Sequence, residues 1–231
     1  MSNTPTTVAQ IAANSLSAVR VFEKWGIDYC CGGKRPLADI CLDKGLDDAA
    51  IEAELNSTAP DPSGQTDWNQ APLADLIEHL LSTHHEYLRR ELPVLAARLE
   101  KVYRVYNQRY GPTLTGLPEV FAALREELET HLQKEEQVLF PALIVGEAAR
   151  KTGTQPPPTC FGTVANPIRM MEAEHASASQ GLERIREITA GFHIPDYACV
   201  TYRALMYGLE ELESDLQLHM HLENNILFPR A

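Results

Sequence analysis

Hydrophobic residues recur at intervals of three and four residues along four long stretches of the chain. These stretches cover residues 73–106, 118–145, 166–191 and 195–226. In the first stretch, Leu81, Leu88, Leu95 and Val102 belong to one such row of positions, which we call the apolar seam. Its spacing is that of the buried face of a helix packed in a bundle. No stretch shows the strict alternation typical of a β-strand. The pattern therefore predicts an all-α fold whose largest part is a four-helix bundle.

A smaller helical unit precedes the bundle. Thr7, Ser15 and Asp47 each come directly before a short run of helical periodicity, and their side-chain oxygens can cap a helix N-terminus. Gly26 is suited to end a helix. Residues 57–71 are polar and rich in Pro, Ser and Gly, which is typical of a linker. We therefore predict a small helical domain in residues 1–56, a linker in 57–71 and the bundle in 72–231.

Charge and composition narrow the class of protein. The formal net charge is −12, and an acidic chain repels the phosphates of nucleic acids. The N-terminus lacks the basic start and apolar run of a signal peptide, and no stretch reaches the ~20 apolar residues that a membrane span needs. Five unevenly spread cysteines argue against a disulfide framework. We expect a cytoplasmic protein that binds neither nucleic acid nor a membrane.

The bundle contains an internal repeat. Residues 131–141 read HLQKEEQVLFP and residues 219–229 read HMHLENNILFP, with five of eleven positions identical. Each copy has a His followed four residues later by a Glu, and a further His stands on the preceding helix, 46 residues earlier in one copy and 44 in the other. The six residues of this pattern are His85, His131, Glu135, His175, His219 and Glu223.

These six residues form a candidate metal site. Residues four apart share one helix face, with Cβ atoms ~5–6 Å apart, so a His and a Glu at that spacing can reach the same metal cluster. Buried His and Glu interrupting an apolar seam are costly unless something satisfies them, and paired metal ions would do so. Four imidazoles and two carboxylates, with no thiolate, suit iron, manganese or zinc. The zinc-protease motif His-Glu-x-x-His is absent, because Arg89 stands where its second His would be.

Other histidines compete for the ligand role. His84 adjoins His85, but only His85 keeps the rhythm of steps of four and three in the first helix, so we predict His85 as the ligand. His79, His193 and His221 fall off the apolar seams, and we predict no ligand role for them.

Two carboxylates are candidates to orient the imidazoles. Ligating histidines usually donate their second ring N–H to a carboxylate or carbonyl. Glu127 lies one turn before His131, and Glu174 adjoins His175. Both are equally compatible with solvated helix charges, so this alternative stays open.

The combined motifs resemble those of the iron–sulfur cluster repair di-iron proteins, also called the repair of iron centres family. VFEKWGIDYCCGG resembles the N-terminal domain of that family, and HHEYLRRELP, HLQKEEQVLFP, MEAEHAS and HLENNILFP resemble its hemerythrin-like domain. The resemblance covers nearly the whole chain. It implies an up-and-down hemerythrin-like bundle with two iron ions, bridged by an oxo group and carboxylates, with the six residues as ligands and Glu135 and Glu223 bridging. Many members of this family carry histidines in the loop after the first long helix. The corresponding stretch of this chain reads VYNQRYGP and contains no histidine.

The same resemblance implies a function. It implies repair of iron–sulfur clusters damaged by nitrosative or oxidative stress, through iron donation, nitric oxide binding or both. The expected partners are damaged iron–sulfur proteins, nitric oxide or oxygen as a small ligand, and a second copy of the chain paired through the N-terminal domain. Two alternatives stay open: a sensor or store for nitric oxide or oxygen, and a nitric oxide reductase.

Cys30 and Cys31 are adjacent, in the sequence CCGGKR. The two glycines expose backbone and sulfur to a partner, and the Lys and Arg would favour thiolates. The alternative is a pair of small buried hydrophobic side chains. The resemblance favours a functional pair that performs redox chemistry or captures iron or an iron–sulfur cluster. We expect Cys41, Cys160 and Cys199 to be packing or surface residues.

Overall fold

The computed structural model describes residues 6–58, 66–110 and 114–231, with the side chain of residue 16 excepted. Helices account for all the regular structure in these segments, apart from one isolated bridge between Thr7 and Pro36. The predicted all-α class is confirmed. Two compact units are present, one formed by Met1–Leu76 with Gln217–Ala231 and the other by Ile77–Leu216. None of the described helices is long and apolar enough to span a membrane.

The first unit begins with four short helices whose ends follow the predicted caps. Thr7 forms a capping box with Gln10, and the Asp47 side chain accepts a hydrogen bond from the Ala50 N–H. Gly26 ends the second helix in a left-handed conformation with φ of 64°. The helices are α1 (Val8–Asn14), α2 (Leu16–Trp25), α3 (Leu37–Lys44) and α4 (Asp48–Ser57). Short helices of this kind are marginal alone, so the caps and a shared apolar core stabilise them.

The C-terminal residues Gln217–Ala231 complete the core of this first unit. Phe22, Tyr29 and Ile51 are fully buried in it, and α1 contacts the turn η3 (Glu223–Leu227). Asn69 donates a hydrogen bond of 2.8 Å to the Ala13 carbonyl. Because residues distant in the sequence meet here, the sequence alone could not place the C-terminal turn in this unit.

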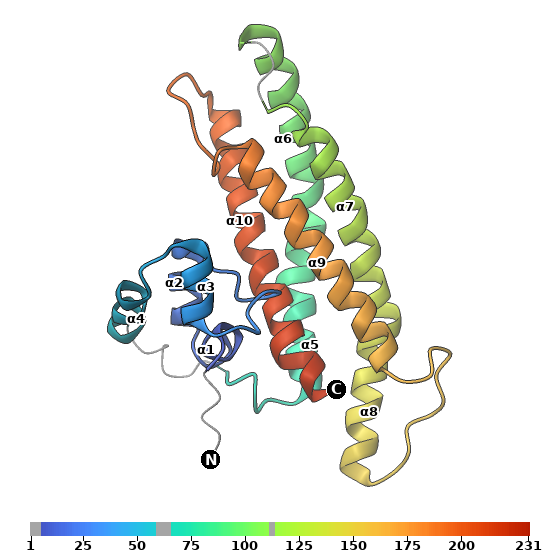
Figure 1. Cartoon of the computed structure of the whole chain (residues 1–231). Coiled ribbons are helices and arrows are strands. Elements are labelled where there is room, and N and C mark those ends of the chain that lie inside the picture. The colour runs from blue at the N-terminus through green and yellow to red at the C-terminus, as the bar shows by residue number, and fades with distance from the viewer. Residues whose placement is uncertain (1–5, 59–65, 111–113) are drawn as a thin grey trace. The chain divides into compact units, whose positions relative to one another are not determined.

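The second unit contains most of the length of the long helices, which lie side by side there (Figure 1), whereas the residues before Ile77 and after Leu216 belong to the first unit. The first rod is α5 (Leu73–His79), η1 (Leu80–His85) and α6 (Glu86–Tyr110), and the second is α7 (Leu117–Lys134), η2 (Glu135–Leu139) and α8 (Phe140–Thr152). The third is α9 (Ala165–Ile188), and the fourth is α10 (Val200–Leu222), followed by η3 and η4 (Phe228–Arg230). All four predicted rods are present. The first runs past the predicted residue 106, and the fourth begins after the predicted residue 195.

The seam predicted for the first rod lies in the core of the bundle. Leu88, Leu95 and Val102 are each at most 1% exposed. Gly208 on α10 packs against this seam so closely that a Cβ atom there would lie 2.7 Å from Leu95 Cδ2. The absence of a side chain at Gly208 therefore lets the two helices approach each other.

The boundaries of the two predicted domains, 1–56 and 72–231, are not tested by these helices and stay a prediction. Residues 59–65 of the predicted linker lie outside the described residues. The end of the linker is held within the first unit, where the Arg230 guanidinium donates to the carbonyls of Trp68 and Ala71.

A left-handed turn follows α9. Ala190, Gly191 and Phe192 have φ values of 51°, 70° and 60°, a conformation that costs about 1–2 kcal/mol for a residue with a Cβ atom. Phe192 is buried, and its N–H donates to Thr189 Oγ1. We expect Ala190→Gly to raise the free energy of unfolding by up to about 1 kcal/mol, measured by denaturant unfolding. Gly191→Ala is the reciprocal control and should lower it by a similar amount.

Candidate metal centre

Three turns of π-helix interrupt the rods at predicted ligands. The turn η1 ends at His85, while η2 and η3 begin at Glu135 and Glu223, the equivalent positions of the repeat. A π turn holds one residue more than an α-helical turn and is frequent at functional sites. The sequence periodicity did not reveal these turns, because they change the register by a single residue.

Within the bundle, Glu135 lies between two imidazoles. Its Oε2 atom is 3.5 Å from His85 Nε2 and 3.3 Å from His131 Nε2. The Nε2 atom of His175, on α9, lies 3.2 Å from that of His131. All four residues are at most 3% exposed. The second unit alone thus gathers three imidazoles around one fully buried carboxylate.

Carboxylates on the outer side of these imidazoles set their orientation. His85 donates from Nδ1 to Glu136 Oε1 at 2.7 Å, and His131 donates from Nδ1 to Glu174 Oε2 at 2.9 Å. A neutral imidazole with its proton on Nδ1 has a lone pair on Nε2. The lone pairs of His85 and His131 therefore face the Glu135 carboxylate, an arrangement that repels unless a cation lies between the donors. The donor chemistry and the geometry of this site fit a metal ion.

The outer carboxylates are kept ionised by their partners. The hydrogen bond from His131, with a second from Lys134, lowers the pKa of Glu174 to about 2 against the opposing effect of burial. Burial raises the pKa of Glu136, but the hydrogen bonds from His85 and Arg89 outweigh it and lower the net value. Each carboxylate thus binds a buried imidazole on one side and a cationic side chain nearer the surface on the other. Glu136 and Glu174 therefore fix the orientations of the two imidazole rings.

The second copy of the repeat has the same local geometry. His219 Nε2 lies 3.2 Å from Glu223 Oε1 one turn further along the helix. His219 is 1% exposed and Glu223 is fully buried. This pair matches His131 and Glu135 in spacing and in burial.

Two groups of buried side chains could hold a metal ion among the residues that the structure describes. One group consists of His85, Glu135, His219 and Glu223, and the other consists of His131, Glu135, His175 and Glu223. All six predicted ligands belong to these groups, and the two glutamates belong to both.

The alternative ligand His84 belongs to neither group. It is 2% exposed, and its Nδ1 atom lies 2.9 Å from Asp215 Oδ1. No local pattern in the sequence marks Asp215 as a partner of His84, whereas the Glu135–Glu136 doublet of the repeat does contain the partner of His85. Of the two candidate orienting carboxylates, Glu174 accepts a hydrogen bond from His131, and Glu127 accepts one from Ser177.

The paired cysteines lie in a tight loop of the first unit. The Asp28 carboxylate accepts backbone N–H bonds from Cys30, Cys31 and Gly32 at 2.8–3.0 Å. A Cβ atom at Gly33 would lie 2.6 Å from the Tyr29 carbonyl oxygen. Close packing of the loop therefore requires these glycines, which is a different reason from the exposure of sulfur that the sequence predicts.

The turn that carries Glu223 also holds this loop. Asn225 donates to the carbonyls of Tyr29 and Cys30 at 3.3 and 3.1 Å. His221 is 1% exposed, with Nδ1 3.3 Å from the Tyr29 carbonyl oxygen, and burial lowers its pKa to about 4. His221, which falls off the apolar seam in the sequence, is thus buried against the cysteine loop.

Removing one outer carboxylate should weaken metal binding without disturbing the fold. Glu174→Gln replaces the charged acceptor of the His131 Nδ1–H, and outer partners of this kind are worth about 10–100-fold in metal affinity. We expect a loss of that size, measured by competition with a chelator. Glu183→Gln, an exposed position on the same helix, is the matched control. An equal loss in both variants would contradict the orienting role of Glu174.

Comparison with known proteins identifies two domains. Residues 76–231 match the hemerythrin HHE cation binding domain, and residues 4–59 match the ScdA_N domain of unknown function, DUF542. The cation-binding domain thus contains all six predicted ligands.

Curated relatives match nearly the whole chain. The iron-sulfur cluster repair protein YtfE of Yersinia pseudotuberculosis serotype IB (strain PB1/+) is 40% identical over 215 residues, which cover 93% of this chain and 90% of the relative. The protein of the same name from Escherichia coli O81 (strain ED1a) is 40% identical over 225 residues, covering 97% and 95%. With both domains matched and such relatives over more than nine-tenths of its length, the chain belongs to the iron–sulfur cluster repair family of YtfE.

Proposed function

We propose that this protein holds two iron ions and uses them to repair iron–sulfur clusters damaged by nitrosative or oxidative stress. The single observation that carries the proposal is the position of Glu135, whose buried carboxylate is within 3.5 Å of the imidazoles of His85 and His131. A carboxylate shared in this way is suited to bridge two metal ions. The names of the relatives supply the repair function.

The proposed ligand set consists of His85, His131, Glu135, His175, His219 and Glu223. Glu135 and Glu223 would bridge the two ions, because both glutamates belong to both candidate groups. Nitrogen and oxygen donors of this kind accept iron, manganese or zinc, and iron is favoured because the relatives act on iron–sulfur clusters. When bound, the pair of irons supplies a labile metal source and a place for a small diatomic ligand.

The protein residues would orient the ions and limit water access. Glu136 and Glu174 hold His85 and His131 with their Nε2 lone pairs directed inward. Leu88 and Leu92, which follow His85 on the same rod, are at most 1% exposed, and this apolar packing would limit the access of water. The four imidazoles would hold the ions mainly through uncharged donors, and such a ligand set suits a centre that gives up its metal.

We propose that Cys30 and Cys31 meet the partner cluster or relay electrons, and that the protein acts in the cytoplasm. All five cysteines are free thiols, as expected where the cell keeps thiols reduced. The partners would be damaged iron–sulfur proteins, and the homodimer implied by the resemblance stays a prediction.

A repair assay tests the proposal. The iron-loaded protein is mixed with an enzyme whose iron–sulfur cluster has been nitrosylated, and recovery of that enzyme is compared with recovery in an equal amount of free ferrous iron. We expect faster recovery with the loaded protein and none with the metal-free protein. Equal rates with free iron would contradict iron donation. Catalytic release of nitrous oxide with an electron donor would favour the reductase instead.

A further inference from the structure

The two adjacent thiols have unequal surroundings. Cys30 is 3% exposed, and its sulfur lies 3.2 Å from Asp28 Oδ1 and 3.7 Å from the Cys31 sulfur. Cys31 is only partly buried. An incoming reagent can therefore reach the Cys31 sulfur more easily than the Cys30 sulfur.

Hydrogen bonds add to this difference. The side-chain amide of Asn224 donates to the Cys31 sulfur at 3.6 Å, and the Cys30 S–H points either to Asp28 or to the same Cys31 sulfur. Donors stabilise a thiolate, whereas the Asp28 carboxylate beside Cys30 disfavours one. Arg35, expected from the sequence to favour thiolates, instead pairs with Asp43 at 2.7 Å. Asn224 is thus a donor that the sequence did not reveal.

We propose that Cys31 and Cys30 form a redox pair that works in a fixed order, in which Cys31 attacks an incoming disulfide and Cys30 then resolves the product. The inference deepens the proposed role of the cysteine pair and rests on it. The Cys31 thiolate attacks one sulfur of a low-molecular-weight disulfide, giving a mixed disulfide and releasing one thiolate. Cys30 then loses its proton to solvent and attacks the Cys31 sulfur. A Cys30–Cys31 disulfide forms, and the second small thiolate leaves.

The electrostatics of Cys30 agree with this order. The hydrogen bond to the Cys31 sulfur, burial and the nearby Asp28 carboxylate all raise the pKa of Cys30 well above its ordinary value. Cys30 therefore keeps its proton, which agrees with the less buried Cys31 acting as the attacking thiol.

The product would be easy to reverse. Consecutive Cα atoms lie ~3.8 Å apart, below the usual ~4.4–6.8 Å of a disulfide, and such strain makes the bond more reducible. Strained disulfides are the labile and catalytic ones. The loop is already tightly held by Asp28 and Gly33, so the two sulfurs are kept side by side for the second step.

The order is tested on reduced, metal-free full-length protein with glutathione disulfide as the probe. Samples are quenched with acid, and the tryptic peptide of residues 25–34 is analysed by mass spectrometry. Cys30→Ser should accumulate a stable mixed disulfide on Cys31, and Cys31→Ser should react at least about tenfold more slowly. The wild type should pass through the mixed disulfide to the internal disulfide. Equal rates in the two variants, or a wild type that stops at the mixed disulfide, would overturn the proposal.

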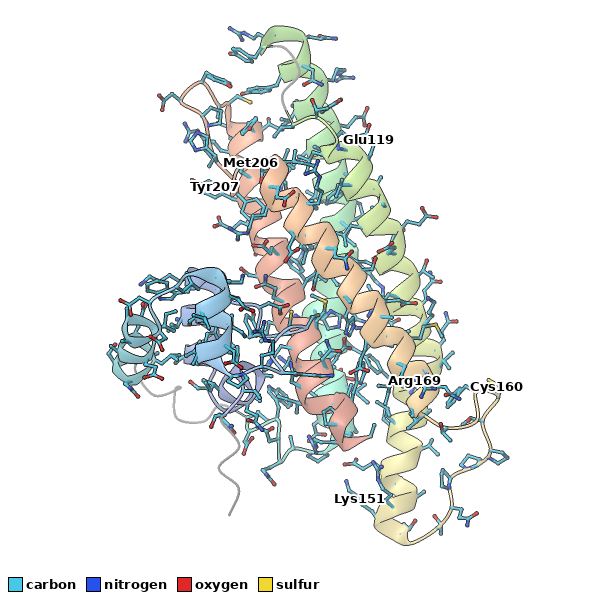
Figure 2. The ribbon with its side chains drawn as sticks, viewed as in Figure 1. Glu119, Lys151, Cys160, Arg169, Met206 and Tyr207 are labelled. Carbon is cyan, nitrogen blue, oxygen red and sulfur yellow. The ribbon has the colours of Figure 1, made fainter. Side chains whose placement is uncertain are left out.

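Further variants separate the chemistry from simple loosening of the loop. In the Cys30→Ser background, Asn224→Ala removes the donor to Cys31 and should slow its modification several-fold. Asn225→Ala releases backbone carbonyls of the loop and a contact with His221 Nδ1 but touches neither sulfur, and it should change the rate less. Equal slowing in both would overturn the role of Asn224. Exposed Cys160, in the loop between α8 and α9 (Figure 2), is the reference thiol in every sample. Because no metal and no repair assay are involved, failure here leaves the di-iron proposal untouched, and the reverse also holds.

Discussion

The double variant Glu135→Gln and Glu223→Gln is expected to lose its bound iron, from about two ions per chain to a level near zero. Amides retain the size of the glutamates but lack the charge that bridges and neutralises two cations. Metal analysis together with visible absorption of freshly purified protein gives the measurement. Glu129→Gln, an exposed position on α7 with 49% side-chain exposure, is the matched control. Retention of iron by the double variant would refute the proposed bridging carboxylates.

The same variant should be more stable than the wild type when both are free of metal. Glu135 and Glu223 are fully buried, and without a cation their charges carry a desolvation cost that neutral amides largely avoid. We expect the metal-free double variant to gain at least about 1 kcal/mol in the free energy of unfolding. With iron present the order should reverse, since binding stabilises only the wild type. This reversal separates loss of a ligand from misfolding.

Leu95→Ala is expected to cause the largest loss of stability, about 2–5 kcal/mol. Leu95 is fully buried and fills the space opposite Gly208, where the two helices approach closely. Truncation removes buried apolar atoms and leaves a cavity that the rigid helices can only partly close. Urea unfolding of the metal-free protein gives the measurement. Val94→Ala, a neighbour that is 37% exposed, should cost far less, and equal losses would contradict the assignment of the seam.

Much of the fold could be predicted because its determinants are local. The steps of three and four between apolar residues predict which face of each rod is buried, and Leu88 and Leu95 lie there in the structure. The caps at Thr7 and Asp47 depend on side chains that act within one turn. The junction of the C-terminal turn with the cysteine loop could not be predicted, since Asn225 and Tyr29 are far apart in sequence and no local pattern links them.

Part of the candidate site could also be predicted from the sequence, and part of it could not. The six candidate donors could be predicted because their spacing repeats along the chain. The partner of His85 is Glu136, on another rod, and only the packing of the two rods brings them together. The unequal roles of Cys30 and Cys31 also need three-dimensional information, because the residues that distinguish them, Asp28 and Asn224, approach from different segments.

The three π turns have a consequence for how such a centre can be gained or lost. Each contains one residue more than the α-helical turn it replaces, so its presence depends on the number of residues in the helix as well as on their identity. Point mutations could exchange every donor for an apolar side chain, yet η1, η2 and η3 would still carry their surplus residues. Return to uninterrupted α-helices would therefore require deletions as well as substitutions, so such a candidate centre is harder to lose in evolution than exchange of its six candidate ligands alone suggests.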